Sequence, residues 1–310
     1  MSEIVLSVVV ATYNRLPELQ TMLDSLLPQV RGKPVEILIA DDRSTDSTWE
    51  WLQTRFAGVS EVHLLRMDAN GGPGPARNLC LAVAAGQYFV PIDSDFIVME
   101  GAIDKVLEAI RENESYRLLF FSCLQYPALQ RLDKIGGRRE IDYEAFLAGE
   151  VGELSPVASL AWLRERKLGF PCLRAGGESL LWADMLHASP GLFMDVPIIL
   201  YRTDVSQRIC TLEYQLEHPA DLAAVSDAMV SLYDRNPSAA LRAVHARKCL
   251  AAGAYHLLAG NTRTGRQRLL SAVSLGSRPA IAALAASLAG KDVFRRLFQV
   301  YRTRVAKAYL

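Results

Sequence analysis

The chain has 310 residues, half of them hydrophobic, with 34 basic and 34 acidic residues. This length suits one large domain or two ordinary ones, and this composition argues against a disordered chain. The five cysteines are widely spaced and none forms a C-x-x-C pair. That spacing argues against a disulfide framework or a zinc site and favours a reducing compartment.

Charge is unevenly distributed along the chain. Residues 1–211 contain 20 basic and 28 acidic residues, whereas residues 212–310 contain 14 and 6. We see neither a signal peptide nor an apolar stretch of the ~18 residues that a transmembrane helix needs. We therefore expect a cytoplasmic protein whose basic C-terminal helices make peripheral contact with the inner face of the membrane, and no nucleic-acid partner.

Apolar, β-branched runs alternate with helix-periodic segments in the first part of the chain. The predicted strands cover residues 5–11, 35–40, 62–65, 88–92, 118–122 and 195–201. Helices are expected after Pro17, around Trp49 and Trp51, after the loop 70–75, at 101–111 and at 180–186. This alternation predicts an α/β fold with a mostly parallel sheet that helices cover on both faces.

The pattern changes at residue 212, where strand signals disappear. Residues 241–258 and 264–275 form a predicted antiparallel helix pair, followed by a short helix at 279–288 and an amphipathic segment at 294–305. We therefore expect two domains. Residues 1–211 would be the ligand-binding domain, and residues 212–310 a basic, helical C-terminal region that faces a membrane or a partner.

Unusual polar residues follow three of the predicted strands. They are Thr12-Tyr13-Asn14, Asp41-Asp42 and Asp93-Ser94-Asp95. In open parallel sheets, ligands bind outside the carboxyl ends of the strands. In an extended chain Asp93 and Asp95 would point the same way, and two carboxylates suit a Mg²⁺ or Mn²⁺ ion that holds a diphosphate. The alternative for this triplet is a solvated acidic turn.

The chemistry of several side chains supports a nucleotide site. Asp42 can accept a hydrogen bond from a base N–H such as the imide of uracil, while Asp41 holds the turn or the ribose side. Gly71 and Gly72 let the backbone approach a ligand closely. Arg77 can counter a diphosphate; its alternative is a solvated helix arginine.

The ordered series of motifs resembles the family 2 glycosyltransferases. These are enzymes of the GT-A fold that use nucleotide sugars and mostly invert the anomeric centre. The resemblance is strong over residues 5–111 and weak over residues 155–205. The segments that carry it are Val8–Arg15, Ala40–Thr48, Asn70-Gly71-Gly72 with Ala76-Arg77-Asn78, and Asp93-Ser94-Asp95.

The resemblance implies roles for individual residues. Asp95 would be the direct metal ligand, and Asp93 would reach the ribose or the metal through water. The remaining expected donor-binding residues are Thr12, Asn14, Arg15, Asp41, Asp42, Gly71, Gly72, Arg77 and Ser94. Glu178 fits the position of the catalytic base, where the family usually has Asp. Asp184 is the alternative base, and Glu178 could instead be a carboxylate that only stabilises a helix N-terminus.

We therefore predict a metal-dependent, inverting glycosyltransferase that uses Mn²⁺ or Mg²⁺. It would transfer a sugar from a nucleotide diphosphate sugar, with UDP as the expected nucleotide, to a hydroxyl of a carbohydrate or lipid-linked acceptor. The expected process is cell-surface polysaccharide or glycoconjugate synthesis. One alternative is a non-catalytic binding or scaffold protein with a degenerate glycosyltransferase domain. The other is a sugar-1-phosphate nucleotidyltransferase, which would need a glycine-rich, basic loop where this chain has Thr12–Leu16.

Overall fold

A computed structural model describes residues 3–205 and 211–308 of the chain. The chain forms two compact units, the first made of Met1–Arg174 and Leu181–Val205 and the second of Ala175–Leu180 and Ser206–Leu310. The short segment Ala175–Leu180 thus groups with the second unit. The predicted division into functional domains at residue 211 stays a prediction.

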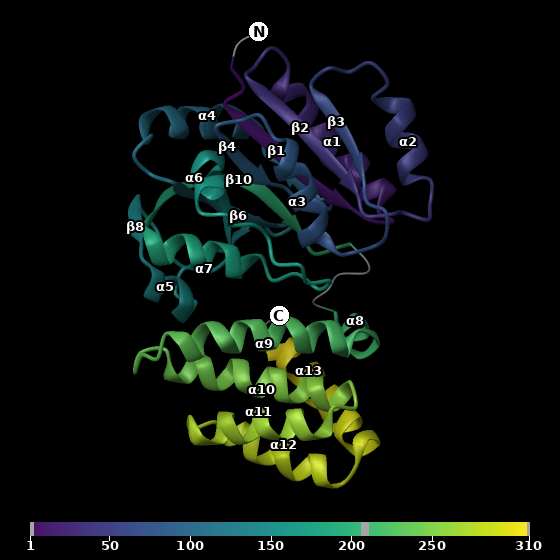
Figure 1. The fold of residues 1–310 in the computed structure, drawn as a ribbon, viewed down its shortest axis with the longest axis vertical. Coiled ribbons are helices and arrows are strands. Elements are labelled where there is room, and N and C mark those ends of the chain that lie inside the picture. Colours follow the sequence, from purple (N-terminus) through teal and green to yellow (C-terminus); the bar gives the residue numbers. More distant parts are fainter. Residues whose placement is uncertain (1–2, 206–210, 309–310) are drawn as a thin grey trace. The chain divides into compact units, whose positions relative to one another are not determined.

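The first unit is an α/β sheet structure (Figure 1). Its strands are β1 (Leu6–Thr12), β2 (Val35–Asp41), β3 (Val62–Arg66), β4 (Tyr88–Pro91), β5 (Phe96–Val98), β6 (Leu118–Tyr126), β7 (Gln130–Arg131), β8 (Arg139–Ile141), β9 (Leu154–Ser159) and β10 (Gly191–Arg202). Its helices are α1 (Leu16–Val30), α2 (Thr48–Arg55), α3 (Pro73–Val83), α4 (Ala102–Glu112), α5 (Tyr143–Ala148), α6 (Leu160–Glu165) and, for the most part, α7 (Glu178–Ala188).

The sheet has the strand order β3-β2-β1-β4-β9-β6-β10-β5. Strands β3, β2, β1 and β4 are parallel, as are β6 and β10. Strand β9, from a region without clear periodicity, runs antiparallel to both β4 and β6, and β5 runs antiparallel to β10. The expected parallel arrangement therefore describes the N-terminal half, and the complete sheet is mixed.

Helices cover both faces of this sheet, as predicted. Val8 and Val10 of β1 contribute to one apolar core, to which α1 and α4 add their buried faces. Val9 points to the opposite core, to which α3 and the part of α7 from Leu181 onward contribute. Strands that are buried on both faces need continuous apolar runs, which explains why these runs predicted the strands well.

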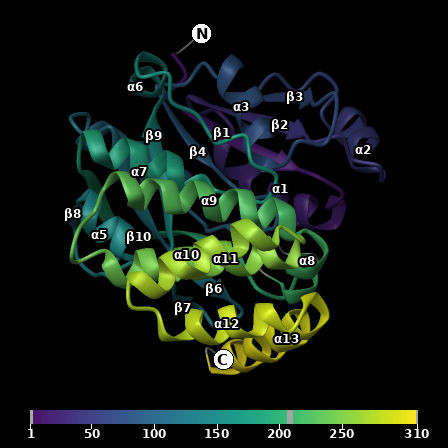
Figure 2. The same ribbon diagram turned by 60° about the horizontal axis from the view of Figure 1, so that its bottom comes forward.

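The second unit is helical (Figure 2). Its helices are α8 (Leu212–Glu217), α9 (Pro219–Arg235), α10 (Arg242–Leu258), α11 (Thr262–Ser274), α12 (Arg278–Leu288) and α13 (Lys291–Ala308). The predicted helix pair is confirmed as α10 and α11. A Cβ on Gly253 would lie 2.7 Å from Leu269, and one on Gly265 would lie 2.8 Å from Leu257, so glycines allow these two helices to pack closely.

A partly buried polar contact also joins three helices of the second unit. The carboxylate of Asp227 in α9 contacts Nε2 of His256 in α10 at 2.7 Å and accepts a hydrogen bond from Nε of Arg268 in α11 at 2.8 Å.

In the described ranges, no helix has both the length and the apolar character that crossing a bilayer requires.

Candidate functional site

The parallel strands bring the predicted polar loops to one edge of the sheet. Thr12 pairs in register with Asp41 across β1 and β2, and Val9 pairs with Pro91 across β1 and β4. The segments that follow β1, β2 and β4 therefore begin side by side. This confirms that the three motifs share the carboxyl edge of the sheet, where ligands of open α/β folds bind.

The two acids of the triplet lie in a turn beyond the strand. β4 ends at Pro91, and the N–H of Phe96 donates to the carbonyl of Asp93 at 3.1 Å. The extended-chain argument for Asp93 and Asp95 therefore does not hold, because the backbone stops alternating before it reaches them. Ser94, between them, is buried.

Each of these acids is paired with a different arginine. Arg15 at the N-terminus of α1 pairs with Asp95, and Arg77 of α3 pairs with Asp93. The Arg77 side chain is only 5% exposed, and its guanidinium lies 5.3 Å from the ring centroid of Phe170. The alternative of a solvated helix arginine is thus wrong for Arg77, which is buried at the site.

Asp42 holds the glycine loop. Its two carboxylate oxygens accept hydrogen bonds from the N–H groups of Gly71 and Gly72 at 2.8 and 2.7 Å. Burial raises the pKa of the Asp42 carboxyl above its ordinary value, and the bonds from the two glycine amides partly offset this effect. Recognition of a nucleotide base by Asp42 stays a prediction. A base N–H that donates to this carboxylate would do so alongside the N–H groups of Gly71 and Gly72.

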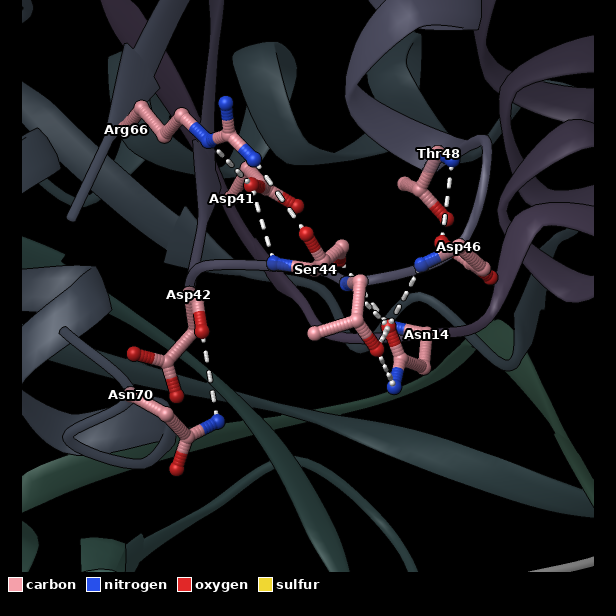
Figure 3. A network of polar contacts seen from close by, with 9 residues as sticks. Asn14, Asp41, Asp42, Ser44, Asp46, Thr48, Arg66 and Asn70 are labelled. Carbon is pink, nitrogen blue, oxygen red and sulfur yellow. Dashed lines mark hydrogen bonds and ion pairs between the residues drawn. The ribbon is translucent and has the colours of Figure 1, made fainter. Parts of the chain in front are cut away.

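Asp41 holds the turn that follows β2 (Figure 3). One of its oxygens accepts from Ser44 N–H and from Arg66 Nε, both at 3.1 Å. The Asp41 side chain is 0% exposed. In this structure it therefore stabilises the turn and is not accessible from the surface. Its other carboxylate oxygen and the hydroxyl of its register neighbour Thr12 are buried, and neither has a hydrogen-bond partner among the residues that the structure describes.

Asn14 joins the loop after β1 to the same turn (Figure 3). Its side-chain oxygen accepts from Thr45 N–H at 2.8 Å and from Asp46 N–H at 3.3 Å, and its own N–H donates to Ser44 Oγ at 3.0 Å. Asn14 has a φ of 49°, a backbone conformation that Asn tolerates better than most residues. Its side chain thus aligns two loops, and direct contact with a donor stays a prediction.

The glycine loop packs against the chain itself. A Cβ on Gly72 would lie 2.6 Å from Arg174 Cα, and one on Gly74 would lie 2.2 Å from the carbonyl oxygen of Pro171. The close approach that Gly72 allows is therefore to the backbone of Arg174. Close approach of Gly71 and Gly72 to a ligand stays a prediction.

Glu178 begins α7 and follows Gly176 and Gly177, which both have positive φ. A Cβ on Gly176 would lie 3.3 Å from a carboxylate oxygen of Glu178. Further along the helix, Trp182 stacks on Phe89 of β4 with ring centroids 6.2 Å apart. Glu178 itself belongs to the second unit, so its role as the base stays a prediction. Asp184, the alternative base, is exposed on the same helix.

Three features of this edge carried no recognisable signal in the sequence. Arg66 of β3 binds Asp41 and lies 5.0 Å from the ring centroid of Trp49. Arg174 donates to Asn70 of the glycine loop at 2.9 Å. Phe170 packs beside Arg77 and exchanges two hydrogen bonds, 2.8 and 2.9 Å long, with Asn78. A single arginine or phenylalanine forms no periodic pattern, so only long-range contacts reveal these roles.

Comparison with known proteins identifies the first part of the chain. Residues 7–121 match the sequence model of Glycosyl transferase family 2. These residues carry a family 2 glycosyltransferase sequence. The family segment includes all the predicted site residues up to Asp95, and Glu178 lies outside it.

A curated relative and two solved structures are similar to the chain. Glycosyltransferase GlyG of Streptococcus pneumoniae is 33% identical over 115 residues, which are 37% of this chain and only 38% of GlyG. The structure of S. aureus TarS 1-349 in complex with UDP-GlcNAc has a TM-score of 0.64 at 16% identity, over 96% of this chain and 92% of TarS 1-349. The mannosyltransferase PcManGT from Pyrobaculum calidifontis, in complex with GDP-Man and Mn²⁺, has a TM-score of 0.57 at 21% identity, over 97% and 83%. These structures show the fold, and the expected GT-A-type α/β fold with a helical C-terminal region is confirmed.

Proposed function

We propose that this chain transfers a sugar from a UDP-sugar to a hydroxyl group of a carbohydrate or lipid-linked acceptor, in the synthesis of a cell-surface polysaccharide or glycoconjugate. The observation that carries the proposal is the grouping of two carboxylates and two guanidinium groups at one sheet edge, from Asp93, Asp95, Arg15 and Arg77. A diphosphate bound with a divalent cation needs both kinds of group. The likeness to TarS in complex with UDP-GlcNAc supports UDP as the nucleotide.

Mn²⁺ or Mg²⁺ fits the acids at this edge. Among the residues that the structure describes, no three His, Cys, Asp or Glu side chains gather as a closed metal site. Mg²⁺ sites in enzymes commonly use one or two carboxylates and complete the shell with water and substrate phosphates. Asp95 and Asp93 would supply the two carboxylates, and the cation would neutralise charge on the departing diphosphate. The Mn²⁺ bound by PcManGT supports this choice.

The proposed reaction is a single displacement with inversion. The acceptor oxygen forms a bond to the anomeric carbon while the bond from that carbon to the diphosphate breaks, and the nucleoside diphosphate leaves. Glu178 takes the acceptor proton as the general base. Arg15 and Arg77 bind the phosphate oxygens, because guanidinium groups form charge-assisted hydrogen bonds with phosphate.

The first test is a thermal-shift panel with UDP, GDP, dTDP and CDP, each with and without Mn²⁺. A ligand of the native state raises the melting temperature by mass action. We expect UDP to give the largest shift and the shift to depend on Mn²⁺. Asp95→Asn should remove this dependence and lower turnover by at least about 100-fold. Asp24→Asn, on the exposed face of α1, is the matched control and should behave as wild type.

The second test concerns the base. Glu178→Gln should lower kcat about 10²–10⁴-fold while UDP still binds, because a general base contributes by this factor. Asp184→Asn removes a carboxylate from the same helix, six residues further along α7, and should leave kcat within a few fold. The reverse pattern would make Asp184 the base, and two active variants would contradict proton transfer by either residue.

Two other outcomes would favour the rival functions. UDP that binds but is neither hydrolysed nor transferred with any hydroxyl acceptor would favour the scaffold protein. Pyrophosphate release from a nucleoside triphosphate and a sugar phosphate would favour the nucleotidyltransferase. Both assays use the full chain and the same Mn²⁺ concentrations as the binding panel.

We also propose that the second unit makes peripheral contact with an anionic membrane. On α13, Val293, Leu297 and Val300 are exposed at helical spacing, and Arg295 and Arg296 are exposed beside them. Apolar side chains with basic neighbours are typical of helices that lie on an anionic leaflet. The 14 basic and 6 acidic residues of residues 212–310 favour the same surface.

Vesicle sedimentation tests this contact. The chain should sediment with phosphatidylserine vesicles at low salt, less at 0.5 M NaCl because salt screens the attraction, and not with phosphatidylcholine vesicles. The double variant Val293→Ser/Leu297→Ser should reduce sedimentation. No sedimentation of the wild type would contradict membrane contact and assign the exposed side chains to another partner. Concentration-dependent self-association that the double variant abolishes would assign them to a second copy of the chain.

A further inference from the structure

The acids expected to bind the metal are already neutralised by the chain itself. Asp95 is paired with Arg15 and Asp93 with Arg77. The side chain of Asp95 is only 14% exposed, so its pair is partly shielded from water. A carboxylate oxygen that accepts from a guanidinium has fewer lone pairs for a cation, and the guanidinium charge repels a divalent ion.

Arg15 stands in a position that its own helix does not favour. It is the residue that precedes the first turn of α1, where the helix dipole presents partial positive charge. A cation there is stabilised by a nearby anion and not by the helix. Asp95 is such a partner in this structure, and a diphosphate would be a stronger one because it offers more charge and more acceptor oxygens.

We propose that Arg15 is a resident counter-cation that keeps Asp95 closed to a free metal ion until a nucleoside diphosphate arrives. The diphosphate then pairs with the Arg15 guanidinium, which releases Asp95. Asp95 thereby becomes available to the metal ion that binds with the diphosphate. Arg77 stands in the same relation to Asp93, although burial beside Phe170 holds it more firmly. This inference rests on the proposed function.

The consequence is positive coupling between metal and nucleotide. Mn²⁺ alone binds weakly because it must displace Arg15, whereas Mn²⁺ in the presence of UDP binds without that competition. By thermodynamic linkage, UDP must gain affinity from Mn²⁺ by the same factor that Mn²⁺ gains from UDP. A site without such a counter-cation would show only the coupling that comes from a metal bound to both the carboxylates and the diphosphate.

The test measures Mn²⁺ binding directly, from the electron paramagnetic resonance signal of the free ion, with and without UDP. Arg15→Gln removes the charge and keeps a polar side chain. Arg15→Lys keeps the charge and loses the planar guanidinium group. Arg31→Gln is the matched control, because it removes the same charge from the exposed residue at the other end of α1. Tryptophan fluorescence in urea shows that each variant is folded.

We expect UDP to raise the affinity of wild type for Mn²⁺ at least tenfold. Arg15→Gln should raise the affinity for Mn²⁺ without UDP about three- to tenfold, and the gain from UDP should shrink correspondingly. Arg15→Lys should lie between these values, and Arg31→Gln should match wild type. A folded Arg15→Gln variant with unchanged or weaker binding of Mn²⁺ alone overturns the inference and leaves the proposed function standing. A wild type that binds neither UDP nor Mn²⁺ overturns both.

Discussion

Replacing Gly72 with alanine should destabilise the first unit strongly. Gly72 has φ 91° and ψ 174°, a backbone region that is nearly confined to glycine and costs other residues about 1–3 kcal/mol. Its Cβ would lie 2.6 Å from Arg174 Cα and 2.8 Å from Arg174 O, so the backbone must move. That movement breaks the bond from Gly72 N–H to the Asp42 carboxylate, and a bond to a charged acceptor contributes about 1.5–3 kcal/mol. The expected loss in the free energy of unfolding is about 2.5–6 kcal/mol.

The assay is urea unfolding followed by tryptophan fluorescence. All four tryptophans, Trp49, Trp51, Trp162 and Trp182, lie in the first unit, so the signal reports on that unit. Gly58→Ala is the matched control. Gly58 has φ 77°, and no atom of the described residues would lie within 4 Å of a Cβ at this position. It should lose only about 1–2 kcal/mol, the cost of the left-handed backbone alone. Equal losses in the two variants would refute the argument that Arg174 and Asp42 make Gly72 necessary.

Three further predictions concern single side chains at or near the carboxyl edge of the sheet. Arg66→Met leaves the buried Asp41 carboxylate without its guanidinium partner and should lower the free energy of unfolding in urea by about 1–3 kcal/mol. This loss is smaller than for a fully buried pair because Arg66 is partly exposed, and an unchanged urea midpoint would contradict the prediction. Because burial raises the native pKa of Asp42 above 3.8, its contribution to stability is greatest below pH 3.8 and declines as pH rises through the native pKa. The stability of wild type minus that of Asp42→Asn should therefore fall as pH rises above 3.8, and a rise over that range would contradict a raised native pKa. Exposed Cys172 should react with maleimide in the native protein, whereas Cys80, which is buried with a pKa raised to about 12, should react only after unfolding, as peptide mapping would show.

The sequence alone predicted most of the secondary structure of this protein. Predicted strands at 5–11, 35–40 and 62–65 correspond to β1, β2 and β3 within one residue at each end. The helix pair at 241–258 and 264–275 corresponds to α10 and α11. These elements were predictable because their periodicity is local, and buried parallel strands and packed helices each have a distinct apolar period.

The sequence also determined which edge of the sheet carries the polar loops. Motifs that follow parallel strands must meet at one edge, so the loops after Thr12, Asp41 and Pro91 were grouped correctly without any coordinates. The antiparallel strand β9 was missed. Its residues, Leu154–Ser159, carry no clear alternation, and its place between β4 and β6 comes from pairing across the sheet.

Only the tertiary structure decided how the site residues are used. It paired Arg15 with Asp95 and Arg77 with Asp93, turned Asp42 toward the glycine amides, and set Gly72 against Arg174. These partners are separated by 16 to more than 100 residues in the chain, and no local pattern encodes such pairs. Periodicity follows from the geometry of a single helix or strand, whereas a charge or a close backbone contact is satisfied by whichever residue the complete fold brings beside it.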